Sequence, residues 1–215
     1  MAQVFHRSTN VISRLSIFGA VFVAAGLVGL FMLLDRSSYN TKQGLVIHQP
    51  VPFSHAHHVG GLGIDCRYCH SSVEKSANAG IPPTATCMNC HKQIWSDAPL
   101  LEPVRESYRS RRPIEWVKVH DLPDYAYFDH SVHLANGIGC ASCHGRVDQM
   151  PLMYQHATLQ MEWCLDCHRN PEAHVRPREH LYDMAWEADD RERLGPELVA
   201  HYGIRENVDC STCHR

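Results

Sequence analysis

The sequence lacks a marked excess of charge of either sign. It has 20 Lys and Arg residues against 23 Asp and Glu residues, which gives a formal net charge of −3 at pH 7. Domains that bind nucleic acid carry clustered basic residues that neutralise phosphates, so the composition gives no indication of a nucleic-acid partner. The sequence also lacks any cysteine outside one repeated pattern, and that absence is more informative than the charge.

The ten cysteines form five C-x-x-C pairs, and a histidine follows each pair at once. The five motifs are Cys66, Cys69 and His70; Cys87, Cys90 and His91; Cys140, Cys143 and His144; Cys164, Cys167 and His168; and Cys210, Cys213 and His214. C-x-x-C-H is the attachment signature of c-type haem. The two thiols reach the two vinyl groups on one porphyrin edge, and the histidine reaches the iron. We therefore predict five covalently attached c-type haems, with these cysteines as thioether donors and these histidines as proximal ligands.

Zinc sites and disulfides are the alternative interpretations of paired cysteines. C-x-x-C also occurs in redox and zinc sites, but a zinc ribbon uses pairs of pairs, so five pairs would leave one unmatched. A disulfide scaffold does not require a histidine after every second cysteine. The five complete motifs therefore favour haem.

The chain length bears on the fold class. Roughly 36 residues per motif follow residue 34, which is near the size below which a chain usually needs metals or disulfides to fold. The haems must then supply much of the apolar core. We predict a mainly α multihaem cytochrome c domain with extensive loops, organised around its haems, plus one N-terminal transmembrane helix.

A single long hydrophobic run, residues 15–34, lies between Arg14 and Asp35 and contains no charged residue. That length spans a bilayer as a helix. A signal peptide has a shorter apolar core followed by a small-residue cleavage site, and none is evident before Asp35. We therefore expect a retained anchor.

The charges that flank this run are weakly biased towards its N-terminal side, with Arg7 and Arg14 before it and Arg36 and Lys42 behind it. This bias favours a cytoplasmic N-terminus. Covalent haem attachment in bacteria takes place outside the cytoplasmic membrane. We expect a single-pass protein of the bacterial cytoplasmic membrane with its haem domain on the periplasmic side.

The haem region contains an internal repeat. Phe53-Ser54-His55-Ala56-His57-His58 precedes the first motif, and Phe128-Asp129-His130-Ser131-Val132-His133 precedes the third. The phenylalanines are 75 residues apart and the following cysteines 74, as expected for a duplicated unit. The expected organisation is a cytoplasmic N-terminus (1–14), a transmembrane helix (15–34), a linker (35–52), a first two-haem unit (53–127), a second two-haem unit (128–170) and a charged helical arm with the fifth haem site (171–215).

The repeated Phe-x-His-x-x-His resembles the tri- and tetrahaem cytochrome c3/c7 family. In that family the first histidine of such a pair ligates the haem of the following motif and the second reaches another haem. The resemblance implies these distal ligands: His55 for the haem at Cys66, His130 for the haem at Cys140, and His58 and His133 for neighbouring haems. His57 makes the first assignment ambiguous.

His120 is the fifth distal candidate. The alternatives are Met150, Met153, Met161, His57 and His156. Methionine as an axial ligand raises the haem potential, but a methionine before a motif is more often a core residue.

Charged residues are dense near the C-terminus. The stretch from Glu179 to Tyr202 has helix-forming residues interrupted by Gly195-Pro196. We expect a pair of solvated helices there, or a docking arm for a partner subunit.

The soluble region with its anchor resembles the pentahaem cytochrome subunit of alternative complex III. The matching segments are the five motifs, Phe53 to Cys66, Trp116 to His133, Cys140 to Met150 and Trp163 to Glu172. The resemblance implies a subunit of a membrane quinol:electron-acceptor oxidoreductase. Its partners there are an iron–sulfur subunit, polytopic quinol-binding membrane subunits, and a monohaem cytochrome c subunit or soluble carrier. The chain would pass electrons from the iron–sulfur side to that carrier.

Two other functions are alternatives to this one. A stand-alone, membrane-anchored multihaem quinol dehydrogenase would need its own quinol pocket, yet residues 15–34 offer only Ser16 as a polar side chain, and ionisable groups at membrane depth mark such sites. A multihaem reductase needs an iron with an open position. Five proximal and five distal candidates allow every iron two protein ligands, which favours electron transfer. We therefore expect no catalytic residue in this chain.

Overall fold

The computed structural model describes residues 4–214 and divides into two units, Met1–Lys42 and Gln43–Arg215. Residues 1–3 of the expected cytoplasmic segment and Arg215 of the expected C-terminal arm lie outside the described residues. Each unit is described by itself.

The first unit is a long apolar helix, α1 (Ser8–Arg36), followed by the single turn α2 (Ser38–Thr41). The 29 residues of α1 would measure about 44 Å at about 1.5 Å per residue, longer than a hydrocarbon core of about 30 Å. None of its residues is buried. In the described part of the chain, α1 is the one helix long and apolar enough to cross a membrane, and it extends beyond the predicted run 15–34 at both ends.

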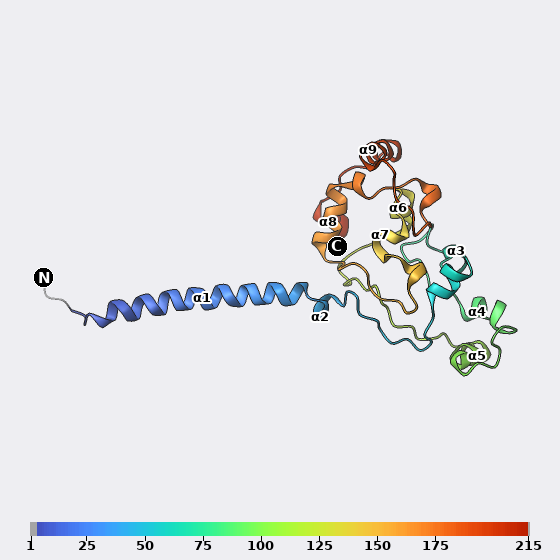
Figure 1. The fold of residues 1–215 in the computed structure, drawn as a ribbon, viewed down its shortest axis with the longest axis horizontal. Coiled ribbons are helices and arrows are strands. Elements are labelled where there is room, and N and C mark those ends of the chain that lie inside the picture. Colours follow the sequence, from blue (N-terminus) through green and yellow to red (C-terminus); the bar gives the residue numbers. More distant parts are fainter. Residues whose placement is uncertain (1–3, 215) are drawn as a thin grey trace. The chain divides into compact units, whose positions relative to one another are not determined.

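The second unit consists of short helices joined by long loops (Figure 1). Its α-helices are α3 (Cys66–Cys69), α4 (Thr84–His91), α5 (Glu102–Ser110), α6 (His130–Ala135), α7 (Cys140–His144), α8 (Met161–Arg169), α9 (Arg191–Tyr202) and α10 (Cys210–Cys213). A π-helical turn, η1 (Ala56–Gly61), and four 3-10 turns, η2 (Pro99–Leu101), η3 (Val147–Gln149), η4 (Pro171–Ala173) and η5 (Arg178–His180), complete it. Between residues 4 and 214, β pairing is limited to isolated bridges. The predicted fold class is confirmed.

The apolar core of this unit is small. One cluster of buried residues consists of Val51, Leu101 and Val104, and a second of Val73, Leu134 and Leu181. Clusters of three aliphatic side chains remove little apolar area from water. This agrees with the prediction that bound groups supply much of the core.

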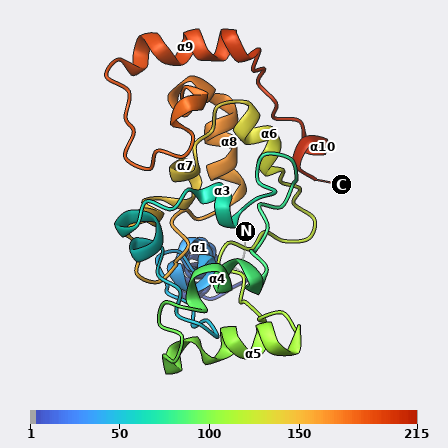
Figure 2. The ribbon, with the colours of Figure 1, turned by 90° about the vertical axis from the view of Figure 1, so that its right-hand side faces the viewer.

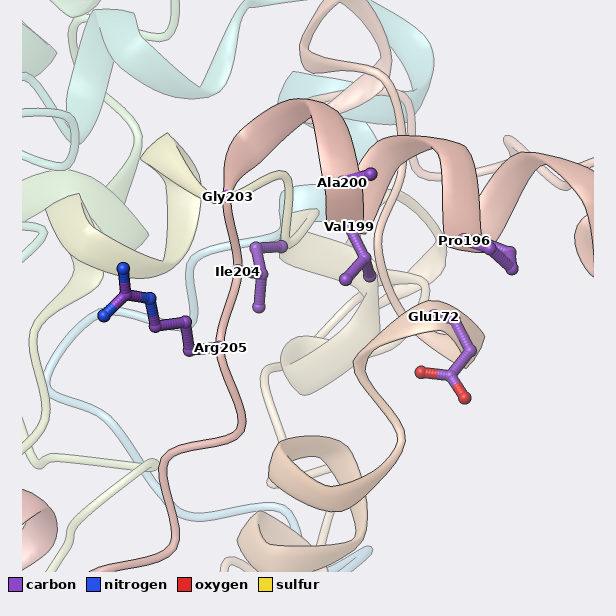
Figure 3. Close-up of a pocket in the computed structure, with 7 residues that line it drawn as sticks. All are labelled: Glu172, Pro196, Val199, Ala200, Gly203, Ile204 and Arg205. Carbon is purple, nitrogen blue, oxygen red and sulfur yellow. The ribbon is translucent and has the colours of Figure 1, made fainter.

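The charged C-terminal stretch differs from expectation, because α9 runs unbroken through Gly195-Pro196. Proline inside a helix removes one backbone hydrogen bond and crowds the preceding turn. Packing against η4 offsets that loss: a Cβ on Gly195 would overlap the carbonyl of Glu172. A cavity of about 470 Å³ lies beside this contact. Figure 3 shows the residues that line it, among them Val199 and Ile204. Two views place α9 and α5 at opposite ends of the unit (Figures 1 and 2).

The π-helical turn η1 follows from the repeat. The first copy has one residue more than the second between its phenylalanine and its first cysteine. The N–H of Ile64 bonds to the carbonyl of His58 across six residues, and that of Ile138 to His133 across five. A π-bulge is how a helix absorbs one additional residue, so both histidine pairs keep their relation to the motif that follows.

Candidate haem sites

Each motif adopts one helical turn. The backbone N–H of His70 bonds to the carbonyl of Cys66 at 2.8 Å, and that of His214 to Cys210 at 2.9 Å. Residues three and four apart share one face of a helix. Both cysteines and the histidine of a motif therefore face the same side, as attachment to one porphyrin edge requires.

None of the ten cysteines forms a disulfide in the structure. Among residues 4–214, no three His, Cys, Asp or Glu side chains gather as they would around a single metal ion. A zinc ribbon would bring two cysteine pairs together around one ion, so these sites do not fit zinc.

Three pairs of imidazoles face each other at nearly the same separation. Ring centroids are 6.1 Å apart for His58 and His91, 6.3 Å for His130 and His144, and 6.2 Å for His133 and His168. Two imidazoles that share one metal at bond lengths of about 2 Å place their ring centres about 6 Å apart. In each pair the second histidine belongs to a C-x-x-C-H motif.

Backbone carbonyls fix the protonation of most of these rings. Nδ1 faces a carbonyl oxygen in His58 (Ser54, 2.8 Å), His70 (Gly80, 2.7 Å), His91 (Ile94, 3.0 Å), His130 (Ala77, 2.7 Å), His133 (Asp129, 2.7 Å) and His214 (Tyr125, 3.1 Å). A carbonyl only accepts, so Nδ1 carries the proton and Nε2 keeps its lone pair. Such an outer hydrogen bond orients metal-binding histidines.

The phenylalanine of each repeat holds both histidines of its copy. Phe53 stacks on His58 at 4.3 Å and meets His55 edge-on at 4.8 Å. In the second copy, Phe128 stacks on His133 at 4.4 Å and meets His130 edge-on at 4.7 Å. The ring contacts of the two copies are therefore the same, although the first copy is a π-helical turn and the second an α-helix.

Burial keeps several rings neutral at pH 7. It lowers the pKa of His55 to about 4, with smaller effects from His70 and His58. It lowers the pKa of His144 to about 3 and that of His120 to about 4. Nδ1 of His55 and Nε2 of His120 are buried without a hydrogen-bond partner. A buried polar atom without a partner is costly, so these atoms fit a site that binds a further group.

The other candidates lie in different surroundings. The ring of His120 is 4.3 Å from that of His144, too close for a metal between them. His57 stacks against Trp95 at 6.1 Å, and His156 lies over Gly145. Met150 is 1% exposed and belongs to the core. The remaining two methionines, Met153 and Met161, are partly and largely exposed.

The attachment sites neighbour one another in an order that differs from the sequence. Asn89 of the second motif donates to the Tyr68 hydroxyl of the first at 2.9 Å. The side chains of Cys66 and Cys140 lie so close that each shifts the pKa of the other, which joins the first motif to the third.

Helix α6 then joins the third motif to the fourth, because its two histidines lie opposite His144 and His168. Burial raises the pKa of Cys164, and the nearby thiol of Cys213 adds to that rise, so the fourth and fifth motifs are neighbours. The series runs second, first, third, fourth, fifth. Its two ends hold the exposed cysteines, Cys90 and Cys210.

The sequence did not reveal the carbonyls that orient the rings. Gly80, Ala77 and Tyr125 act through backbone oxygens, which no side-chain motif records. Nor did it reveal that Arg176 and Arg191 lie beside the third motif.

A mainly helical unit with repeated C-x-x-C-H turns, paired imidazoles and a small apolar core defines a multihaem c-type cytochrome. Residues 126–215 match the family described as "Cytochrome c7 and related cytochrome c". The chain is also 32% identical over 143 residues to the "Menaquinone reductase, multiheme cytochrome c subunit" of Nitratidesulfovibrio vulgaris (strain Hildenborough), covering 57% of this chain and 68% of that relative. The chain belongs to this family of multihaem cytochrome c subunits, and c-type haem is its cofactor.

Proposed function

We propose that this chain carries five c-type haems and conducts electrons within a quinone-linked membrane complex of the alternative complex III type. The observation that carries the proposal is the threefold recurrence of imidazole pairs at 6.1 to 6.3 Å. Haem iron with two strong protein ligands exchanges electrons and leaves no open position for a substrate. Backbone carbonyls of this chain orient the rings, and burial keeps several of them neutral.

The distal ligands in this scheme are His58 opposite His91, His130 opposite His144, and His133 opposite His168. By the repeat, His55 serves the first motif, and its pKa is lowered partly by the nearby His70. His120, whose Nε2 is buried and unpartnered, completes the set.

Five haems are tested by intact-mass measurement of the denatured protein. We expect the mass of the polypeptide plus five haems, because each motif adopts the helical turn that attachment needs. Replacing both cysteines of one motif by alanine removes one haem's mass. A wild-type mass with four haems or fewer would contradict the proposal.

In this proposal the series of attachment sites defines the electron path. The second and fifth motifs lie at its ends and expose a cysteine each, which suits exchange with partners. These are an iron–sulfur subunit on one side and a monohaem cytochrome c subunit or soluble carrier on the other. Polytopic subunits supply the quinol site, and α1 anchors the haem domain on the periplasmic side.

A second candidate is electron flow in the opposite direction, into the quinone pool. The relative's name, menaquinone reductase, favours it. The complex isolated in mild detergent separates the two. Reduction of cytochrome c by a quinol supports the first direction, and reduction of a menaquinone analogue by reduced cytochrome supports the second. Isolation of the chain without any partner subunit would instead favour a stand-alone quinol dehydrogenase.

A further inference from the structure

A cavity beside the third motif collects arginines. It has a volume of about 370 Å³. One side is formed by Ala141 and Ser142 of the motif and by Gly145, the residue that follows the motif. The other lining residues include Arg146, Arg176, Trp186, Glu187 and Arg191. Neither the family nor the proposed electron transfer assigns this cavity a ligand.

Arg176 is a buried cation, only 7% exposed. One of its terminal nitrogens, Nη1, donates to the carbonyls of Asp183 at 3.0 Å and His180 at 3.4 Å. Its Nε is buried and has no hydrogen-bond partner. Burial of this kind is expensive for a charged group unless an anion accompanies it.

Arg191 brings a second positive charge to the same place. Its guanidinium donates to the carbonyl of Val175. The guanidinium carbons of Arg176 and Arg191 lie 5.2 and 5.3 Å from the centre of the same Trp186 ring. Burial lowers the pKa of Arg176, and repulsion by Arg191 lowers it further.

No acidic side chain of the described residues forms an ion pair with this pair of arginines, although the nearby Asp183 acts to raise the pKa of Arg176. Within residues 4–214, neither Arg176 nor Arg191 forms an ion pair with a carboxylate, whereas Arg146 in the same cavity pairs with Asp148 at 2.6 Å. Glu187 lines the cavity without pairing with either arginine. The cavity therefore holds two guanidinium groups that have no ion-paired carboxylate among the described residues.

We propose that Arg176 and Arg191 bind a carboxylate, and that this carboxylate is a propionate of a haem carried by this chain. The planar guanidinium matches a carboxylate with two parallel hydrogen bonds. A buried cation needs a counter-ion that is always present, and a covalently held haem keeps its propionates at a high effective concentration. The proposal rests on haem attachment as proposed above.

The consequence is a raised potential for one haem. Ferrous haem carries one positive charge fewer than ferric haem, so a fixed cation nearby favours the reduced form. The variants Arg176→Gln and Arg191→Gln remove that charge in the full-length, haem-loaded protein. Arg193→Gln is the matched control, because Arg193 lies on α9 two residues from Arg191, is exposed, and already pairs with Asp190 and Glu197.

A spectroelectrochemical titration measures the result. In each variant we expect the ratio of oxidised to reduced form of one haem to rise about ten-fold at a given applied potential. This corresponds to a midpoint potential lower by about 59 mV for a one-electron couple. The potentials of Arg193→Gln should equal those of the wild type. Redox-difference infrared spectra of protein with ¹³C-labelled propionates should show a carboxylate band that is lost in Arg176→Gln. If that variant does not accumulate, Arg191→Gln at its less buried position supplies both measurements.

Two controls distinguish a failure of the proposed haem attachment from a failure of the proposed arginine–propionate contact. Intact mass shows whether all haems are attached in each variant, so a missing haem counts against the proposed function and not against the arginine site. Sodium acetate and inorganic phosphate at constant ionic strength test a diffusible anion. Saturable changes in the wild-type potentials or melting temperature on adding acetate would overturn the propionate assignment. So would unchanged potentials and infrared bands in both arginine variants.

Discussion

In the proposed ligand scheme individual imidazoles hold the haem irons, and the surroundings of each ring set its protonation and orientation. The ring of the second histidine of each repeat stacks on a phenylalanine ring. Its Nδ1–H donates to the backbone carbonyl four residues earlier. The pKa of His133 is lowered chiefly by burial. A neutral, oriented ring with a free Nε2 is ready to bind iron without first losing a proton.

Replacing one of these rings should disturb one haem. We expect His130→Ala to convert one haem from low spin to high spin, because its partner ring 6.3 Å away, His144, loses the opposing ligand. Visible absorption and electron paramagnetic resonance measure the change. His201→Ala, at an exposed position, is the control. Identical spectra for His130→Ala and the wild type would refute the ligand scheme.

The role of His120 is tested by the same two spectra, measured on its own alanine variant. We expect His120→Ala to give one high-spin haem other than the one at Cys140, because 4.3 Å from His144 leaves no room for a shared iron. A variant with all haems low spin, together with a near-infrared charge-transfer band, would indicate that a methionine serves the fifth iron instead.

At the scale of elements, close backbone contacts hold the two repeats and the C-terminal arm in place. The turn η1 lies against η3, where the N–H of Ala56 bonds to the carbonyl of Met150 at 3.0 Å. Gly60 approaches so closely that a Cβ would overlap the carbonyl oxygen of Asp148. In the C-terminal arm, Gly195 makes a similar approach to η4.

Adding one methyl group at the first contact should be destabilising. We expect Gly60→Ala to lower the free energy of unfolding by about 1–3 kcal/mol, the usual cost of overpacking. Gly61→Ala is the control, because a Cβ there meets its nearest atom, the carbonyl oxygen of Ala56, at an ordinary 3.7 Å. Thermal unfolding of the haem-loaded protein measures both. Equal midpoints for the two variants would show that η1 does not need this contact.

At the scale of the whole molecule, the apolar helix α1 and the haem unit differ in the chemical groups that they contain. None of the residues of α1 is buried, and the predicted run 15–34 contains no ionisable side chain that could accept protons from a quinol. Quinol chemistry within a membrane needs such groups. The haem unit, in contrast, places a second imidazole 6.1 to 6.3 Å from the histidine of the second, third and fourth motifs.

The isolated chain should therefore conduct electrons without oxidising quinol. We expect the haem-loaded protein, expressed alone, to exchange electrons with soluble cytochromes and to show negligible quinol turnover until partner subunits are restored. Stopped-flow absorption at the haem bands measures both reactions. The buffer reaction of quinol with cytochrome alone is the control. Sustained quinol turnover by the isolated chain would point to a stand-alone dehydrogenase.

The sequence by itself determined the cofactor class, the fold class and the apolar anchor helix. These follow from local chemistry: five C-x-x-C-H turns, an uncharged run of 20 residues and too little chain per motif for an independent core. The repeated Phe-x-His-x-x-His also predicted that His130 and His133 would lie near different motifs, since residues three apart share a helix face.

Tertiary structure alone decided the order of the attachment sites, the carbonyls that orient the rings, and the arginine cavity. Each depends on contacts between segments far apart in the chain, such as His130 with Ala77 or Cys66 with Cys140. It also decided that α9 continues through Pro196, because packing of Gly195 on η4 outweighs a local preference to break. Local propensity and motif spacing contain no information on such long-range packing, which is why these features could be found only in the folded chain.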